Sequence, residues 1–341
     1  MRPARLCPIL KKRGKTGRAA IPENANIMKT ILGTGQLGMA IMENLLQINP
    51  DESILLVNRA GKLDVSIPQN VEIMAADVTN RNDLETIAQR SELIFSCTDV
   101  PYPLWDDFYP KTADALAFAL SKSDAKLVFA DNMYSYGNVQ GAEMHEGMPH
   151  SARTKKGQIR ASVIQTLLQS GQSFSDRVAF VKAADFIGPR IYKGVFGTDF
   201  LEKLATGKRI TLFGKAKLPH TFTYIRDFAK AMVNVGTSTD TFGEIWHVPN
   251  APALNLLKWT QLFETEFNQK AKVWVLPKSV VWAAGLFDPF IREFYELSYQ
   301  FEHPYLVNHD KYVARFGDHS TNPLAIARET SSWFKAKNSL V

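Results

Sequence analysis

Hydrophobic positions alternate between short continuous runs and helical spacing from residue 31 to about residue 183. Between the runs, apolar residues recur every three or four positions, as at Leu37, Ile41, Leu45 and Ile48. The runs of strand length are residues 31–32, 53–57, 71–74, 93–97, 126–130 and 178–181. This alternation predicts an α/β fold in which a doubly wound parallel sheet carries helices on both faces.

After residue 183 the alternation loosens, and proline and glycine separate shorter segments. Strands are predicted at residues 210–213, 222–225, 244–248 and 273–276, and helices near residues 200, 227, 256 and 280. We therefore predict two units. Residues 28–185 form a Rossmann-type domain, and residues 186–341 form a smaller C-terminal α/β lobe that mainly binds substrate, with some segments returning to the main sheet.

Charge is concentrated at the N-terminus. The formal net charge is +6, and residues 1–27 contain seven basic residues and one acidic residue. The other 314 positions hold 33 of each sign, so nothing indicates a basic face for nucleic acid. We interpret residues 1–27 as a basic tail that is disordered or not native to the protein, with an organelle transit peptide as the alternative.

Other compositional features exclude several classes of protein. The most hydrophobic later segment, residues 273–291, is interrupted by two prolines and two charged residues, so no membrane span is expected. Two cysteines, Cys7 and Cys97, favour a reducing compartment, and we predict a cytoplasmic protein. The seven histidines have no paired spacing suited to a metal, so none is predicted.

A glycine-rich turn follows the first predicted strand, and a helix is predicted from about Gln36. Its pattern is G-x-G-x-x-G: the first glycine permits a tight turn, the second lets a diphosphate approach the backbone, and the third lets helix and strand pack closely. The alternative is a purely structural strand-to-helix turn. The candidate cofactor-binding residues here are Gly33, Thr34, Gly35, Gln36, Leu37 and Gly38.

The end of the second predicted strand indicates which dinucleotide is bound. A carboxylate there would bind the adenosine ribose hydroxyls, but the chain has Asn58 and Arg59 instead. Arg59 can bind a 2′-phosphate in a bidentate manner, which favours NADP(H), with NAD(H) as the alternative. The alternative interpretation is that Arg59 is a solvated arginine on an exposed turn and binds no cofactor. Asp77 and Val78, after the third strand, are placed to contact adenine, or Asp77 caps the next helix.

These residues resemble the short-chain dehydrogenase/reductase superfamily, in an atypical branch of its extended, NAD-dependent epimerase/dehydratase-like type. The resemblance extends from about Met28 to Lys337. It implies NAD(P) binding, a carbonyl or alcohol substrate that is often a nucleotide sugar, and a homodimer. Besides the glycine loop and Asp77-Val78, the matching segments are LIFSCTDVPYPLW, KLVFADNMYSYG, ADFIGPR, HTFTYIRDFAKAM and PYLVNHDKYVARFG with the later Trp333.

The catalytic positions of the resembled family are substituted. Leu32 stands where extended members have their first glycine, and Asn132 stands where they have a catalytic serine or threonine. Lys156 and Arg160 occupy the positions of the tyrosine and lysine of the Y-x-x-x-K pair. Arg160 could keep the contact with the nicotinamide ribose, but it cannot donate a proton at neutral pH.

Proton transfer then needs another group. Lys156 lies one helical turn before Arg160, so each cation disfavours the other's charge, and in a dry site Lys156 could act as general acid or base. The alternative is that both are solvated residues of a polar helix start. Tyr134 is the other candidate donor, ahead of Tyr136, although a buried tyrosine that only fills space is common.

Two further polar residues complete the predicted site. Asn132 can donate a hydrogen bond to a substrate oxygen and stabilise developing negative charge. Thr98, at the end of the fourth strand, is expected near the nicotinamide, because parallel strands present residues to a ligand at their carboxyl ends. Asp99 is a candidate turn cap, and Cys97 a small core residue. The aromatic segment at residues 282–301 is interpreted as core rather than as a dimer face.

The predicted function is an NAD(P)(H)-dependent oxidoreductase or epimerase-like enzyme that transfers hydride to or from a carbonyl or alcohol, with NADP favoured. A catalytically inactive NADP(H)-binding sensor is one alternative, and a nucleotide-sugar epimerase or dehydratase is the other. The expected partner is a small-molecule substrate, for which a sugar nucleotide is one candidate. No nucleic acid or membrane partner is predicted.

Overall fold

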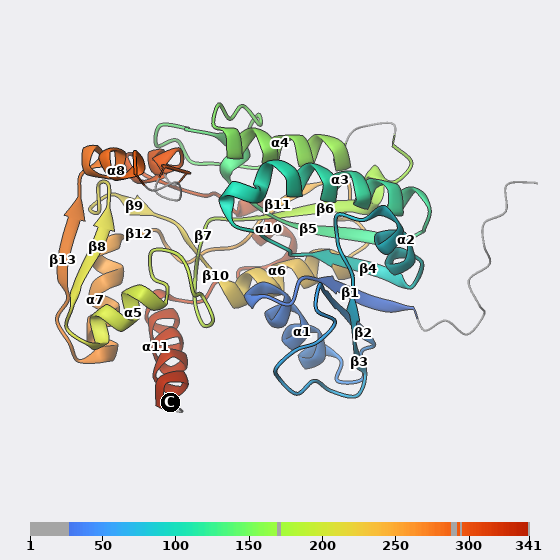
Figure 1. Cartoon of the computed structure of the whole chain (residues 1–341), viewed down its shortest axis with the longest axis horizontal. Coiled ribbons are helices and arrows are strands. Elements are labelled where there is room, and N and C mark those ends of the chain that lie inside the picture. The colour runs from blue at the N-terminus through green and yellow to red at the C-terminus, as the bar shows by residue number, and fades with distance from the viewer. Residues whose placement is uncertain (1–26, 169–171, 288–291, 294, 340–341) are drawn as a thin grey trace, which may run out of the picture.

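A computed structural model describes residues 27–168, 172–287, 292–293 and 295–339. All but one residue of the predicted basic tail lies outside these ranges. The core of the molecule is a seven-stranded sheet in which every neighbouring pair of strands is parallel (Figure 1). Its order is β11-β6-β5-β4-β1-β2-β3, so the chain winds outward in both directions from β1. The predicted doubly wound α/β fold is therefore confirmed.

The strands coincide closely with the predicted apolar runs. Apart from the edge strand β3, in which only Val71 is buried, their interiors are mostly buried, as expected for strands covered by helices on both faces. The sheet consists of β1 (Met28–Leu32), β2 (Ile54–Asn58), β3 (Val71–Ala75), β4 (Ser91–Ser96), β5 (Lys126–Asn132), β6 (Val178–Ala183) and β11 (Ile245–His247).

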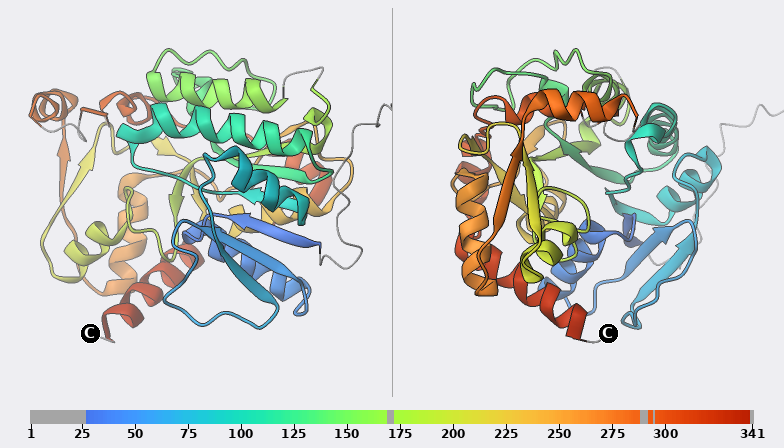
Figure 2. Two further views of the ribbon diagram at one scale, coloured as in Figure 1. Left: turned by 45° about the vertical axis from the view of Figure 1, so that its right-hand side comes forward. Right: turned by 60° about the vertical axis from the view of Figure 1, so that its left-hand side comes forward.

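Helices cover both faces of this sheet, as Figures 1 and 2 show. One face carries α2 (Arg81–Gln89), α3 (Trp105–Ser121) and α4 (Lys155–Leu168); the other carries α1 (Gln36–Ile48) and α6 (Ile225–Thr237). The predicted apolar stripe of α1 is buried at Leu37, Ile41 and Leu45, whereas Ile48, the last residue of the helix, is exposed.

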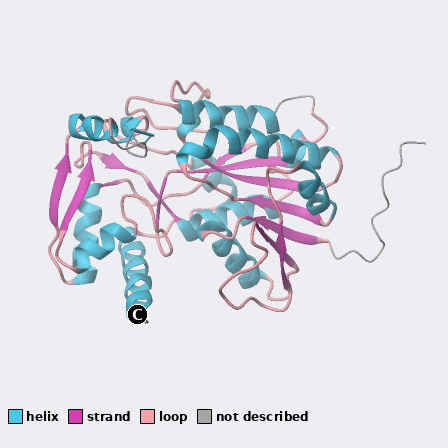
Figure 3. Cartoon of the chain, in the orientation of Figure 1, coloured by secondary structure: helices cyan, strands magenta, loops and turns pink. Residues whose placement is uncertain are grey.

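The C-terminal half contributes to the main sheet and also builds a separate layer. β11 and α6 belong to the sheet, whereas β8 (Arg209–Phe213) pairs with β13 (Lys272–Leu276) at the far end of the molecule (Figure 3). Around that pair lie α5 (Thr198–Ala205), α7 (Leu256–Phe267), α8 (Lys278–Gly285) and α11 (Pro323–Ser339). The domain boundary at residue 185 stays a prediction.

Short elements connect the two parts. β7 (Asp185–Ile187) pairs with β10 (Phe222–Tyr224), and β9 (Pro219–His220) pairs with β12 (Leu254–Asn255). Short turns of 3-10 helix, η1 (Tyr102–Leu104), η2 (Tyr134–Tyr136), η3 (Ser175–Arg177) and η4 (Ser298–Phe301), and the helix α10 (Asp310–Phe316) complete the described elements.

The aromatic segment after residue 281 is not the core helix that its spacing predicts. Trp282, in α8, and Leu286, just after it, are 54% and 60% exposed, because α8 lies at the outer edge of the lobe (Figure 1). Phe290 and Phe294 lie outside the described residues. In the part of the chain that is described, no helix is long and apolar enough to cross a bilayer.

Candidate cofactor and active site

The three glycines of the loop after β1 have different physical roles. Gly33 has a φ of +101°, and a Cβ there would lie 3.0 Å from the backbone nitrogen of Thr98. A Cβ on Gly38 would lie 1.9 Å from the carbonyl oxygen of Gly33, which no side chain could tolerate. A Cβ on Gly35 would meet nothing within 4 Å. Gly33 and Gly38 therefore permit the fold, whereas Gly35 keeps open space beside the backbone.

That open space lies at the N-terminus of α1. The helix begins at Gln36 with Gly35 as N-cap, and no side chain caps it. The first N–H groups of a helix have no partner within the helix, and the helix dipole makes this end partly positive. Residues 33–38 thus fit the diphosphate of a nicotinamide dinucleotide, which when bound supplies a hydride donor or acceptor.

The Asn58 side chain at the end of β2 forms hydrogen bonds to the two loops around it. Its Nδ2 donates to Thr34 Oγ1 at 2.9 Å and to the Lys62 carbonyl at 3.0 Å, and its Oδ1 accepts from the Gly61 backbone N–H at 2.7 Å. Asn58 therefore connects the glycine loop to the turn after β2. Arg59 beside it is exposed, so its guanidinium can meet a ligand from solvent.

Asp77 caps a turn rather than the next helix. Its carboxylate accepts from the Thr79 backbone N–H at 2.9 Å and from the Thr79 hydroxyl at 2.8 Å. These bonds, with a smaller effect of the nearby Arg59 charge, lower the pKa of Asp77. The N-cap of α2 is instead Asn80, so the predicted helix-capping role of Asp77 is wrong. Val78 is buried in the core.

The end of β4 lies directly against the glycine loop. Thr98 is the residue that a side chain on Gly33 would strike, so the two turns are in contact. Asp99 accepts from the Val100 backbone N–H at 2.9 Å and from the Tyr109 hydroxyl at 2.8 Å. Burial raises the pKa of Cys97 to about 12, so this thiol is not a nucleophile at neutral pH.

At the end of β5 the candidate Asn132 and Tyr134 lie in one turn. Asn132 Oδ1 accepts from the Tyr134 backbone N–H at 3.0 Å, which leaves the side-chain amide to donate elsewhere. The Tyr134 hydroxyl lies 3.0 Å from that of Tyr102. Burial raises the pKa of Tyr134 well above its usual value, so this phenol is protonated at neutral pH.

Lys156 is buried rather than solvated. It is 1% exposed, and its ammonium forms ion pairs with Glu293 and, at 3.0 Å, with Glu296. The Lys156 backbone N–H also donates to Glu296 Oε1 at 3.0 Å. The ammonium lies 5.2 Å from the centre of the Tyr102 ring. Carboxylates from the C-terminal half thus reach over the first turn of α4.

Arg160 shares a helix face with Lys156, as predicted, but its partners are different. Its Nη2 donates to the Tyr109 hydroxyl at 2.7 Å, and its guanidinium lies 3.9 Å from the centre of that ring and 4.6 Å from that of Trp105. Nη1 forms an ion pair with Asp131 Oδ1 at 3.3 Å that lacks hydrogen-bond geometry, and Nε has no hydrogen-bond partner among the described residues. Nε is therefore a buried donor without a hydrogen bond.

Sequence reasoning missed a buried charge pair beneath the β5 turn. Lys182 Nζ lies 2.5 Å from Asp131 Oδ2 and donates to the Asn132 carbonyl at 2.8 Å and to Ser135 Oγ at 2.9 Å. Burial lowers the pKa of Lys182, although the Asp131 charge opposes this. The sequence signal was a lysine inside the apolar strand VAFVKA.

A second pair that sequence reasoning missed lies beyond β6. His220 Nε2 is 2.9 Å from Asp185 Oδ2, and the imidazole is stacked between Phe301 and Tyr305 at centroid distances of 4.9 and 4.7 Å. This pair lies near Tyr134: the pKa of Tyr134 is raised mainly by burial, and the charge of Asp185 raises it further. Asp185 lies in the ADFIGPR segment, but no spacing in the sequence joins it to His220.

These groups form a row along one edge of the sheet. In parallel strands the carboxyl ends meet at the same edge, where α/β proteins bind ligands. Following the strand order from β3 to β6, the row reads Asp77, Asn58 and Arg59, the glycine loop, Thr98, Asn132 and Tyr134, and Asp185. The dinucleotide-binding features thus lie at one end and the candidate proton donors at the other.

Comparison with known proteins defines the family. A model of the NAD dependent epimerase/dehydratase family matches residues 31–248, well over half of the chain. The chain belongs to this family, which confirms the predicted class of NAD-dependent, epimerase/dehydratase-like enzyme and a nicotinamide dinucleotide as its cofactor. A comparison with curated proteins found no match.

Solved structures of low sequence identity share the fold. The dTDP-glucose 4,6-dehydratase of Bacillus anthracis, in complex with NAD, superimposes with a TM-score of 0.76 at 16% identity over 92% of this chain and 98% of its own. UDP-glucuronic acid 4-epimerase of Bacillus cereus gives 0.74 at 14% identity over 92% and 98%. UDP-glucose 4-epimerase of Thermus thermophilus gives 0.71 at 18% identity over 90% and 99%.

Proposed function

We propose that this protein is an NADP(H)-preferring oxidoreductase or epimerase-like enzyme that transfers hydride to or from a carbonyl or alcohol carbon of a small molecule. The observation that carries the proposal is the row of residues at the carboxyl edge of the sheet, from Arg59 through the glycine loop to Tyr134. Residues of this row can bind the phosphates of a cofactor, and the neighbouring strands carry candidate proton donors.

The preference for NADP(H) rests on the end of β2. No carboxylate follows this strand, and the Asn58 side chain is occupied by the loops around it. The exposed Arg59 is a cation that a 2′-phosphate would neutralise, with planar N–H donors that match phosphate geometry. Binding of NAD(H) is the alternative; the dehydratase of Bacillus anthracis and the epimerase of Bacillus cereus are both known in complex with NAD.

The chemical roles follow from which donors are available. Asn132 holds a substrate oxygen with its side-chain amide, and Tyr134 gives a proton to that oxygen when the carbonyl is reduced. Arg160 is assigned to the nicotinamide ribose, and for that contact its buried Nε would have to become accessible. Lys156 is the alternative proton donor, and for that role its ion pairs with Glu293 and Glu296 would have to open.

A sensor without hydride chemistry is the second candidate. It is favoured by one observation: the lysine at the position of the family's catalytic tyrosine is already paired with two carboxylates. A sugar nucleotide is the candidate substrate if the reaction resembles those named for the solved relatives. We also propose that the protein forms a homodimer and that the boundary between its two units lies at residue 185.

Fluorescence titration with NADPH and NADH, followed by a substrate panel, tests the proposal. Ketones, aldehydes and UDP-sugars are added while the absorbance of the reduced nicotinamide is followed. Tighter binding of NADPH, with turnover of one member, is the expected result. Failure of all nicotinamide dinucleotides to bind would overturn it, and binding with no turnover across the panel would favour the sensor. Asn132→Ser and Lys156→Tyr test the assigned positions, because both should change turnover or cofactor affinity.

A further inference from the structure

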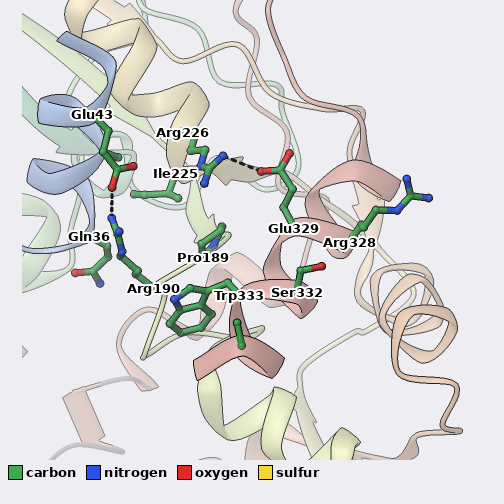
Figure 4. Close-up of a pocket in the computed structure, with 12 residues that line it drawn as sticks. Gln36, Glu43, Pro189, Arg190, Ile225, Arg226, Arg328, Glu329, Ser332 and Trp333 are labelled. Atoms are coloured by element: carbon green, nitrogen blue, oxygen red, sulfur yellow. Dashed lines mark hydrogen bonds and ion pairs between the residues drawn. The ribbon is translucent and has the colours of Figure 1, made fainter. Parts of the chain in front are cut away.

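A pocket of about 600 Å³ lies between α1, the N-terminus of α6, α11 and the loop after β7 (Figure 4). Its size is that of a small-molecule site. Among the residues that line it are Glu43 of α1, Arg190 of the loop, Arg226 of α6, and Glu329 and Trp333 of α11. We infer that this pocket binds a small anion that carries a planar ring, such as an aromatic phosphate.

The arginines of the pocket are held in place but not saturated. Arg190 Nη1 donates to Glu43 at 2.7 Å, and Arg226 Nη1 donates to Glu329 at 3.1 Å. The Arg190 and Arg226 side chains are 41% and 58% exposed. A guanidinium has five N–H donors, and each of these has one hydrogen bond to a carboxylate, so donors on both remain for a ligand oxygen.

The charges lining the pocket favour an anion. Arg328 also lines it, and its nearest carboxylate, Glu266, is 3.8 Å away. Three arginines and two glutamates are in the lining, and Glu266, the partner of Arg328, is not among the lining residues. Ile225, at the start of α6, also lines the pocket.

Arg190 adopts a conformation that its residue type disfavours. Its φ is +65°, in the left-handed region, which is sterically unfavourable for a residue other than glycine. Glycine would avoid this cost, and Gly188 two residues earlier does adopt a positive φ. In Figure 4 the Arg190 side chain passes Trp333 near its backbone end, and its guanidinium points to Glu43, with which it pairs. Unfavourable backbone conformations of this kind gather at ligand sites.

Trp333 supplies the reason for a planar ring. It lies below the two ion pairs in Figure 4, and its ring makes an edge contact with Tyr192, at a centroid distance of 5.8 Å. An aromatic ligand can pack on the indole while its phosphate reaches Arg190 and Arg226. Because Gln36 of the glycine loop also lines the pocket, the test has to separate this site from the cofactor site.

Calorimetric titration with phenyl phosphate, with and without saturating NADP⁺, makes that separation. We expect phenyl phosphate to bind in both cases, phenol to give no heat, and Arg190→Gln and Arg226→Gln each to weaken binding by about tenfold. Arg81→Gln is the matched control, because Arg81 is an exposed arginine paired with Asp114 on another face. Its affinity for phenyl phosphate should not change.

Three results would overturn the inference: no heat with phenyl phosphate, loss of binding when NADP⁺ is added, or equal effects of the pocket variants and Arg81→Gln. Arg328→Gln provides a further variant if Arg190→Gln fails to fold, because Arg328 is exposed and its ion pair is long. It too should weaken binding. The experiment does not depend on turnover, so it stands apart from the proposed enzyme activity.

Discussion

The Lys182 ammonium lies 2.5 Å from the Asp131 carboxylate, and both side chains are withdrawn almost completely from solvent. Removing two charges from water is costly, so such a pair persists only where further hydrogen bonds complete it. Here Lys182 also bonds the Asn132 carbonyl and Ser135, which fixes the turn that carries the candidate active-site residues. The Lys182–Asp131 pair therefore holds in place the turn after β5, which carries Asn132 and Tyr134.

Breaking this pair should destabilise the protein. We expect Lys182→Met and Asp131→Asn each to lower the free energy of unfolding by about 3 kcal/mol, because each leaves a buried group without its partner. The double variant should lose less than the sum, since the second change removes the group left unpaired by the first. Urea denaturation of the four proteins measures this. Strict additivity would show that the two side chains are not coupled.

The glycines of the loop should separate folding from cofactor binding. Gly35→Ala adds a methyl group in open space, so the melting temperature should stay unchanged while nicotinamide dinucleotide binding is lost, because the methyl occupies the place of the diphosphate. Gly38→Ala puts a methyl group against the Gly33 carbonyl and should destabilise the fold itself. Thermal denaturation and fluorescence titration distinguish the two. Unchanged affinity in Gly35→Ala would place the diphosphate elsewhere.

Arg59 should determine the choice of cofactor. We expect Arg59→Ala to weaken NADPH binding by about tenfold and to leave NADH binding unchanged, because only NADPH carries the phosphate that the guanidinium would bind. Arg315→Ala is a suitable control, since Arg315 is an exposed arginine of α10 that pairs with Asp240. An equal loss for both cofactors would mean that Arg59 does not recognise the 2′-phosphate.

Stability should depend on pH through His247. Burial lowers the pKa of His247 to about 3, and its Nε2 lies 2.8 Å from the Tyr136 hydroxyl. In the unfolded chain its pKa is near 6.5, so on acidification the unfolded state takes up the proton first. This group alone should remove about 2 kcal/mol of stability between pH 7 and pH 5.

The comparison with His247→Gln isolates that contribution. Burial raises the pKa of Asp227 to about 6, which acts in the opposite direction below pH 6, but this effect is common to both proteins and cancels in the difference. Urea denaturation at pH 7 and pH 5 should therefore show a smaller acid-induced loss in the variant. An equal loss in both would mean that His247 is protonated in the folded state.

The periodicity of the chain was sufficient to predict the sheet, because each buried strand and each amphipathic helix leaves a local hydrophobic pattern. The site was predicted only where a motif is also local, as in the glycine loop. Lys156 illustrates the limit: its partners Glu293 and Glu296 lie 137 and 140 positions away, and no local pattern joins them. Its burial therefore could not be deduced from the polar segment TKKGQIR.

The pairing of Asp185 with His220 shows the same limit, since it depends on how β7 and β9 come together. Lys182 differs, because a charged residue inside an apolar strand is itself unusual and could have indicated a buried partner. The exposed Trp282 shows the converse: helical spacing predicts an apolar face, but only the position of α8 at the edge of the lobe determines whether it is covered.

Tyr134 and Tyr136 offer a matched pair for identifying the proton donor. Among the described residues, the Tyr134 hydroxyl hydrogen-bonds only to the phenol of Tyr102, whereas the Tyr136 hydroxyl lies 2.8 Å from a buried imidazole that burial keeps neutral. His247 Nδ1 lies 2.8 Å from the Asn308 carbonyl, so it carries the proton and Nε2 accepts from Tyr136. Tyr136 is therefore committed to the structure, and Tyr134 is the better donor.

We accordingly expect Tyr134→Phe to lower kcat/KM for the carbonyl substrate found in the panel by about 100-fold or more, as loss of a general acid does, with NADPH affinity unchanged. Tyr136→Phe should instead reduce the melting temperature and leave kcat/KM within about threefold, because it removes a buried hydrogen bond and no reacting group. Steady-state kinetics and thermal denaturation of both variants provide the comparison. Full activity in Tyr134→Phe would transfer the proton-donor role to Lys156, the other candidate, whose ion pairs with Glu293 and Glu296 would then have to open during the reaction.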